Sequence, residues 1–261
     1  ISSMISIEKD NDNNDRFSFN LPFRCIDIKF GRSNDVLSTL PWDVKSIIWL
    51  DYDGDLTAAE LADIKFLVMN AVPGSLIIMS VNAHPYSVRD VSMEDYAEHR
   101  FEKLKSKVSE GKIPTDINGT KLAGWGTAKV YRRIIQNEID ETLNDINGVR
   151  EPGTHLKYKQ LFNFHYCDGA KMLTTGGMLY DEGQQNIVDQ CAFEDLEYIS
   201  SDEAACLIEV PNLTYREIRH LDKQLPKKID EELVAHSIPE KDIKKYERIY
   251  RYFPNFAETE N

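Results

Sequence analysis

The chain has 261 residues, of which 41% are hydrophobic, and a formal net charge of -13 at pH 7. This length is sufficient for one large α/β domain, or for one such domain with a small appendage. The negative charge disfavours duplex DNA as a partner, because no overall positive field attracts the phosphate backbone.

Targeting signals and cysteine spacing indicate the compartment. The sequence contains neither a signal peptide nor an apolar stretch of about twenty residues, so we expect no membrane partner. The cysteines lack the close pairs that are typical of zinc sites, so no metal is expected. Scattered cysteines of this kind predict a reduced protein in the cytoplasm. They are Cys25, Cys167, Cys191 and Cys206.

Two strands are predicted in the N-terminal part of the chain. Residues 4–8 form the first and end at Glu8, and a polar loop is expected at residues 11–15. Residues 25–30 form the second strand and end at Gly31. Ser33 or Asn34 is suited to cap a short helix directly afterwards.

The third predicted strand and its end are the most informative segment. Residues 46–50 are an apolar run that stops at Asp51-Tyr52-Asp53-Gly54. A capping-box pattern then predicts a helix that begins near residue 57. Because open α/β sheets bind ligands beyond the carboxyl ends of their strands, these acids indicate a ligand crevice.

The remaining elements complete an α/β pattern. A fourth strand at residues 75–81 leads to His84, and helices are predicted at 93–110 and 126–146. Asp168-Gly169 is a hairpin turn signal between strands at residues 160–166 and 171–179.

We therefore predict a Rossmann-like, mostly parallel sheet that an antiparallel hairpin closes. The nearly continuous apolar runs predict strands that are covered on both faces. The Rossmann-like domain is expected at residues 1–210, and a charged helical extension at residues 211–261.

This layout, with acids at successive strand ends, resembles the class I S-adenosylmethionine-dependent methyltransferases, and more narrowly bacterial proteins described as O-methyltransferases. The resemblance covers residues 4–181. It implies S-adenosylmethionine as cofactor and methyl transfer to an acceptor that the sequence does not identify.

The resemblance assigns cofactor contacts to the first two strand ends. Glu8 would accept hydrogen bonds from both ribose hydroxyls, with Asp10 as a second choice. Gly31 would permit close backbone approach, and Ser33 or Asn34 would lie near the adenine. An ordinary helix cap explains Ser33 and Asn34 equally well.

The third and fourth strand ends would face the methionine moiety and the acceptor. Asp51 and Asp53 would balance the sulfonium charge, and Asp51 would orient or deprotonate the acceptor. Tyr52 would stack on a planar acceptor or form a wall beside the sulfonium. His84 would accept a hydroxyl proton, although a histidine after a strand is more often structural. We expect the carboxylates of Glu8 and Asp51 to project from neighbouring strands into one cleft.

One departure from the superfamily concerns the glycine-rich turn that normally holds the methionine carboxylate. Such a turn is expected before Glu8, and only seven residues precede Glu8 here. The glycines at 124–126 and 175–177 do not replace it, because neither pair follows a strand and opens a helix in the required context. We expect a fragment that lacks an N-terminal strand and helix, rather than a degenerate relative.

Two other functions remain open. The first is a catalytically inactive Rossmann-like interaction module with a protein partner, which the missing glycine turn favours. The second is a magnesium-dependent phosphohydrolase similar to haloacid dehalogenases, with Asp51 and Asp53 as its acids. Methylation of DNA bases is disfavoured, because the sequence has Asp51-Tyr52-Asp53-Gly54 in place of Asp-Pro-Pro-Tyr.

Overall fold

The computed structural model describes residues 3–9, 12–87, 92, 95–228, 230–234 and 237–254. Asp10, the second choice for the ribose contact, lies outside the described residues. The chain divides into two units, residues 1–206 and residues 207–261. Among the described residues, no helix is both long enough and apolar enough to span a bilayer.

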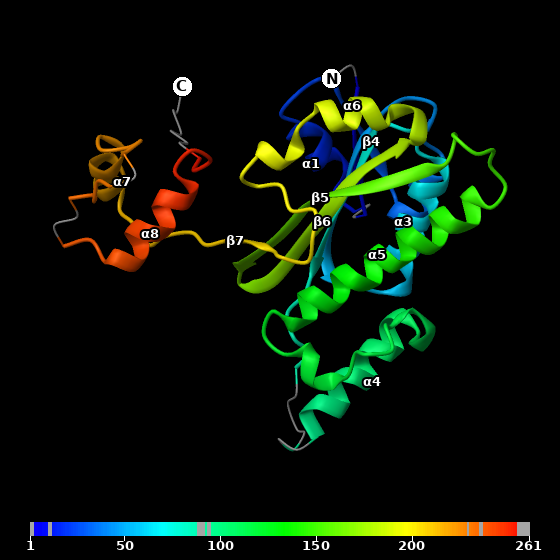
Figure 1. Cartoon of the computed structure of the whole chain (residues 1–261), viewed down its shortest axis with the longest axis horizontal. Helices are drawn as coiled ribbons and strands as arrows, with labels where there is room; N and C mark the ends of the chain where they lie inside the picture. Colours follow the sequence, from blue (N-terminus) through cyan, green and yellow to red (C-terminus); the bar gives the residue numbers. More distant parts are fainter. Residues whose placement is uncertain are drawn as a thin grey trace. The chain divides into compact units, whose positions relative to one another are not determined.

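The larger sheet has five strands (Figure 1). In sheet order they are β3 (Ile47–Asp55), β4 (Ser75–Asn82), β6 (Ala170–Asp181), β5 (Leu156–Asp168) and β7 (Cys206–Ile208). β3 and β4 are parallel, whereas β6 is antiparallel to both β4 and β5. Gly169, at φ 75°, forms the tight turn between β5 and β6, so the predicted closing hairpin is confirmed.

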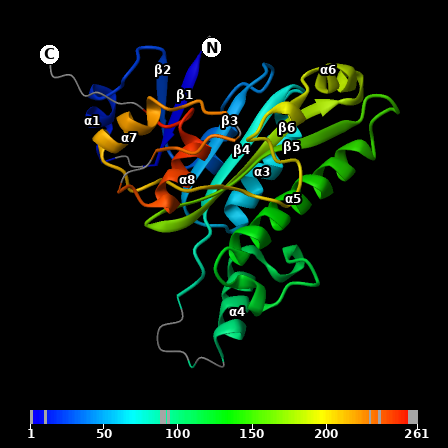
Figure 2. The same ribbon diagram turned by 60° about the vertical axis from the view of Figure 1, so that its left-hand side comes forward.

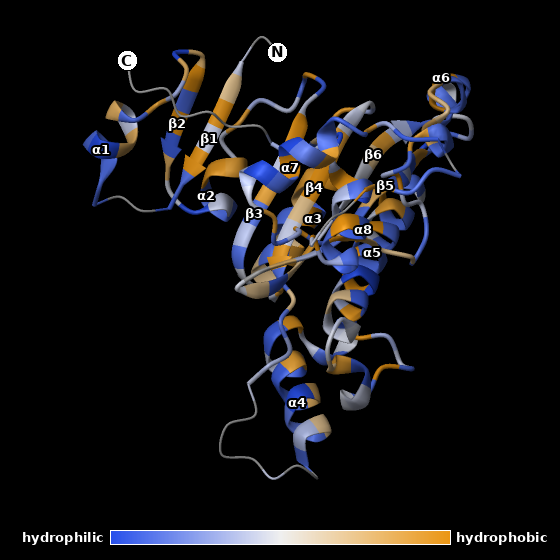
Figure 3. Ribbon diagram, turned by 90° about the vertical axis from the view of Figure 1, so that its left-hand side faces the viewer, coloured by the Kyte–Doolittle hydropathy of each residue, from blue (hydrophilic) through white to orange (hydrophobic). Residues whose placement is uncertain are grey.

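The first two strands form a separate parallel sheet. β1 (Met4–Glu8) pairs with β2 (Ile26–Phe30), and Glu8 lies opposite Phe30. Figures 2 and 3 show β1 between β2 and β3, although β1 and β3 are not hydrogen-bonded to each other. The predicted Rossmann-like α/β class is confirmed, with its strands divided between two sheets.

Two helices, α3 (Ala58–Asn70) and α5 (Gly126–Asn147), cover one face of the larger sheet (Figure 1). α3 begins as predicted, because the Thr57 side chain accepts from the backbone N–H of Ala59 and the Thr57 N–H donates to Glu60. Apolar side chains of both helices join those of β4 in one core. Its fully buried members include Leu61, Ile64, Leu67, Ile77, Met79, Ile134 and Ile139.

The other face of β3 is uncovered, which corrects the expectation that both faces are buried. Ile48 and Leu50 point toward the helices, whereas Ile47 and Trp49 remain 71% and 61% exposed. The alternation follows from the two-residue period of a strand. A continuous apolar run therefore did not distinguish a strand buried on both faces from one buried on a single face.

The other helices of this unit lie in the connections between the strands. The predicted polar loop at residues 11–15 is partly helical, because α1 already begins at Asn14. α4 follows β4 and packs against the 3₁₀ turn at Gly119–Leu122. These helices are α1 (Asn14–Phe19), α2 (Ser33–Leu37), α4 (Tyr96–Val108) and α6 (Gln185–Gln190).

The second unit has a small apolar core of its own. α7 (Tyr215–Asp222) begins with a capping box at Thr214, and α8 (Glu240–Ile249) follows Pro239. The hydroxyl of Tyr246 donates to Asp222 at 2.6 Å. The core residues are Ile218, Leu221, Ile238, Ile243 and Tyr246.

A substitution at Gly119 tests the close packing of the 3₁₀ turn against α4. A Cβ at this position would lie 1.6 Å from the carbonyl oxygen of Ala97 in α4. Backbone atoms cannot move aside as a flexible side chain does, so Gly119→Ala should lower the free energy of unfolding by about 2–3 kcal/mol. Urea denaturation would measure this change.

Gly111→Ala is the control, because a Cβ at Gly111 would meet no atom within 4 Å. The packing argument would be wrong if both substitutions had the same effect.

Candidate functional site

The carboxyl edge of β3 carries the predicted acids. Asp51 and Asp53 are exposed, and the Asp55 carboxylate lies 3.7 Å from Lys107 Nζ. The strand does not stop at Asp51, because a register shift lets the pairing resume between Asp55 and Asn82. The acids therefore lie on the last residues of a parallel strand, at the edge where such sheets bind ligands.

Tyr52 points away from Asp51 and Asp53, into a buried hydrogen-bond network. Its hydroxyl donates to Asp63, a residue of α3 that is only 3% exposed. The same hydroxyl lies 3.2 Å from Ser33, and the Asn34 amide donates to the other oxygen of Asp63. Burial and the bond to Asp63 raise the pKa of Tyr52 well above its usual value.

Tyr52 and Asn34 thus both bind Asp63, which the sequence did not single out, and Ser33 joins this network through the Tyr52 hydroxyl. Ser33, Asn34 and Tyr52 connect the segment after β2 with β3 and α3. The sequence did contain one signal for a buried carboxylate, because Asp63 directly precedes Ile64 in the apolar stripe of the predicted helix.

Glu8 and Gly31 come together at the end of the smaller sheet. The N–H of Gly31 donates to the carbonyl oxygen of Glu8 at 2.9 Å, and the Glu8 side chain is half-buried. Gly31 has φ 146°, and a Cβ there would lie 3.0 Å from Val36 Cγ2. Both the positive φ and the closeness of Val36 therefore favour glycine at this position.

His84 lies apart from these groups, in the wall of a hollow of about 560 Å³. The N–H of Ala83 donates to the carbonyl oxygen of Lys171 at 2.8 Å, so β6 brings Lys171 to the end of β4. α4 supplies Arg100 to the same hollow. Its lining residues are His84, Pro85, Tyr86, Ser87, Tyr96, Arg100 and Lys171.

Lys171 also belongs to a stack of three side chains. Its Nζ lies 4.9 Å from the centre of the Trp125 ring, and the His165 ring stacks on Trp125 at 4.9 Å with an interplanar angle of 14°. His165 is only 4% exposed, and its Nε2 has no hydrogen-bond partner among the described residues. Burial lowers the pKa of His165 to about 4, and the nearby charge of Lys129 contributes.

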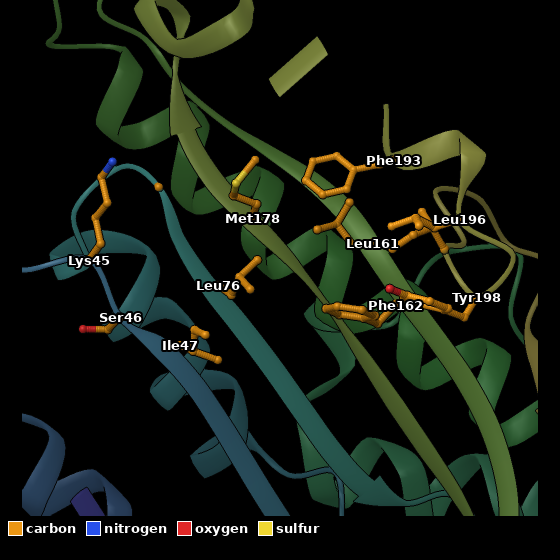
Figure 4. A pocket seen from close by; sticks show the side chains of 12 residues that line it. Lys45, Ser46, Ile47, Leu76, Leu161, Phe162, Met178, Phe193, Leu196 and Tyr198 are labelled. Atoms are coloured by element: carbon orange, nitrogen blue, oxygen red, sulfur yellow. The ribbon is translucent and has the colours of Figure 1, made fainter. Parts of the chain in front are cut away.

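A second hollow, of about 340 Å³, lies at the opposite end of the parallel strands (Figure 4). Leu76, Phe162, Met178 and Phe193 give it an apolar wall, and Lys45 is the charged residue at its rim. Because the starts of β3 and β4 border it, it is remote from the predicted acids. The described residues of its lining include no aspartate, glutamate or histidine.

The predicted site residues therefore form three groups, and His84 lies apart from them. Glu8 pairs with Gly31, and Asp51 and Asp53 share a strand end. Ser33, Asn34 and Tyr52 surround Asp63. Neither hollow is lined by Glu8 or Asp51, so their joint role in one cleft stays a prediction.

Comparison with known proteins gives a family and a distant structural likeness. The model of a family described as "Putative O-methyltransferase" matches residues 1–261. Among solved structures, the chain is similar to a putative O-methyltransferase from Klebsiella pneumoniae, with 12% sequence identity and a TM-score of 0.33. That match covers 68% of this chain and 62% of the other chain. A search of curated proteins found no match.

Removal of the Asp63 carboxylate should destabilise the first unit. Asp63→Ala would remove the charged acceptor of the Tyr52 hydroxyl and the Asn34 amide and leave them only Ser33 and the Ala59 carbonyl oxygen, so the free energy of unfolding should fall by about 2–3 kcal/mol. The exposed Asp53→Ala is the matched control and should change it by less than about 0.5 kcal/mol. Urea unfolding of both variants would measure these changes. Equal losses of unfolding free energy in the two variants would contradict a structural role of the Asp63 network.

His165 should make stability depend on pH. Its pKa is about 4 in the folded protein and 6.5 in the reference state, so below pH 6.5 the unfolded chain binds a proton that the folded chain does not. Stability that is present at pH 7 is therefore lost as the pH falls toward 4, by about 2–3 kcal/mol.

The measurement is the difference in unfolding free energy between pH 7 and pH 4.5. This difference should shrink in His165→Gln and stay as in the parent in His99→Gln, since His99 is exposed on α4. An unchanged difference in His165→Gln would rule out the buried imidazole as its source.

Proposed function

Because the chain belongs to the family described as "Putative O-methyltransferase", whose model matches all of residues 1–261, we propose that the protein is an S-adenosylmethionine-dependent O-methyltransferase. The family match is the observation that carries this proposal. The comparisons lend no support to a phosphohydrolase or to a catalytically inactive module.

The donor groups at the strand ends fit such a cofactor chemically. The half-buried Glu8 lies at the end of β1, and a carboxylate has the two acceptor oxygens that suit a ribose diol. The carboxylates of Asp51 and Asp53 are exposed at the end of β3, where they would favour a positively charged sulfonium.

When bound, S-adenosylmethionine supplies an activated methyl group. An acceptor hydroxyl must also release its proton. For the methyl transfer itself, the residues of the site need chiefly to position the acceptor and exclude water, because an in-line displacement depends on alignment.

Tyr52 has a supporting role in this proposal. Its hydroxyl is engaged by Asp63, so it holds the end of β3 against α2 and α3. This anchoring would fix the direction in which Asp51 and Asp53 project. His84, at the end of β4, would be the proton acceptor for a hydroxyl substrate.

Titration of the intact protein with S-adenosylhomocysteine in a calorimeter tests the proposal. Glu8→Ala should weaken binding at least about tenfold, because charge-assisted hydrogen bonds to the ribose are lost. Asp27→Asn is the control, since Asp27 lies within β2, paired with Lys29, and not at a strand end. Absence of binding to the parent, or an equal effect of both substitutions, would contradict the proposal.

A further inference from the structure

The hollow at the end of β4 is positively charged in a negatively charged protein. Arg100 and Lys171 line it, together with His84, and the described residues of its lining include no aspartate or glutamate. The chain as a whole carries a net charge of -13. A concave surface with two permanent cations focuses its field and attracts anions, in contrast to the rest of this surface.

The two cations are available to a ligand. Among the described residues, no carboxylate lies within ion-pair distance of Arg100 or Lys171. Other lysines of this unit do form ion pairs with acids, namely Lys105, Lys107, Lys112 and Lys121. Arg100 Nε is buried and has no hydrogen-bond partner among the described residues. A buried guanidinium N–H without an acceptor is costly, so a ligand oxygen at this position would be stabilising.

Aromatic rings hold both cations in place without using their hydrogen-bond donors. The Arg100 guanidinium carbon lies 5.9 Å from the centre of the Tyr96 ring, and Lys171 Nζ lies 4.9 Å from that of Trp125. Cation–π contacts engage the charge and leave N–H groups free for carboxylate or phosphate oxygens.

The size of the hollow suits an organic anion better than a small inorganic ion. Its volume is about 560 Å³, and Tyr86 and Tyr96 contribute ring surface to its walls. The Tyr86 hydroxyl lies 2.7 Å from that of Tyr131, which fixes the Tyr86 ring. Fixed aromatic walls favour a flat, apolar molecular body attached to the anionic group.

The charges at the carboxyl edge of the parallel strands are therefore divided. The end of β3 carries the exposed Asp51 and Asp53, whereas the hollow at the end of β4 carries Arg100 and Lys171. Asp55, whose charge acts on Tyr86 in the wall of the hollow, lies 3.7 Å from Lys107 Nζ. A cationic methyl donor beside the acids and an anionic acceptor beside the cations would each lie in a field of the opposite sign.

We propose that this hollow binds the methyl acceptor, and that the acceptor is a flat organic molecule with a carboxylate or phosphate group held by Arg100 and Lys171. This inference rests on the proposed methyltransferase function. It adds the chemical class of the acceptor and two residues that determine specificity for it.

Direct binding to the intact protein tests the inference without turnover. The probes are benzoate, phenyl phosphate and the neutral benzamide, titrated by ligand-observed NMR. At least one anion should bind about tenfold or more tightly than benzamide, since charge-assisted hydrogen bonds distinguish them. Which anion binds more tightly identifies the carboxylate or the phosphate as the recognised group.

Three variants locate the binding. Arg100→Gln and Lys171→Gln should each weaken the better anion about tenfold, with little effect on benzamide. Lys103→Gln is the matched control, because Lys103 is an exposed cation on the same helix as Arg100 and outside the hollow. Circular dichroism would verify that each variant is folded.

The inference is overturned if benzamide binds the parent as tightly as both anions, or if Lys103→Gln weakens the anion as much as Arg100→Gln. A parallel titration with S-adenosylhomocysteine separates this failure from that of the proposed function. Cofactor binding without anion selectivity overturns the acceptor assignment alone. Anion selectivity without cofactor binding overturns the methyltransferase role and, with it, the acceptor assignment.

Discussion

The parallel pairing of β3 with β4 is the constraint on which the candidate site depends. In this register Asp51 lies opposite Ser80 and Asp55 lies opposite Asn82, so the acids of β3 and the segment that contains His84 leave the sheet at the same edge. Parallel strands present their carboxyl ends together, and the polar residues beyond them become available to a ligand. An antiparallel pairing would have placed the two ends on opposite edges of the sheet.

A buried carboxylate on α3 supports this edge. Asp63 receives hydrogen bonds from Tyr52 and Asn34 and thereby connects β3 to the segment that follows the smaller sheet. Because a buried carboxylate is costly unless it is hydrogen-bonded, the network favours one arrangement of these segments. The exposed acids of β3 thus rest on an anchored strand, which suits a site that must position two reactants.

The sequence predicted the elements whose signals are local. The hairpin followed from Asp168-Gly169, and α3 followed from its capping box. Other features depend on contacts between distant segments. Asp63 is a charged residue whose burial depends on Tyr52, and Arg100 lines the hollow only because the fold brings α4 near the segment that follows β4. The exposure of Trp49 likewise could not be read from an apolar run, since a strand buried on one face can have the same composition.

The most direct measurement is a crystal structure of the intact protein with S-adenosylhomocysteine. The account predicts that the ribose hydroxyls bind the Glu8 carboxylate and that the sulfur lies beside Asp51 and Asp53. A ligand bound in the apolar hollow between Leu76 and Phe162, or ribose hydroxyls without contact to Glu8, would contradict the account.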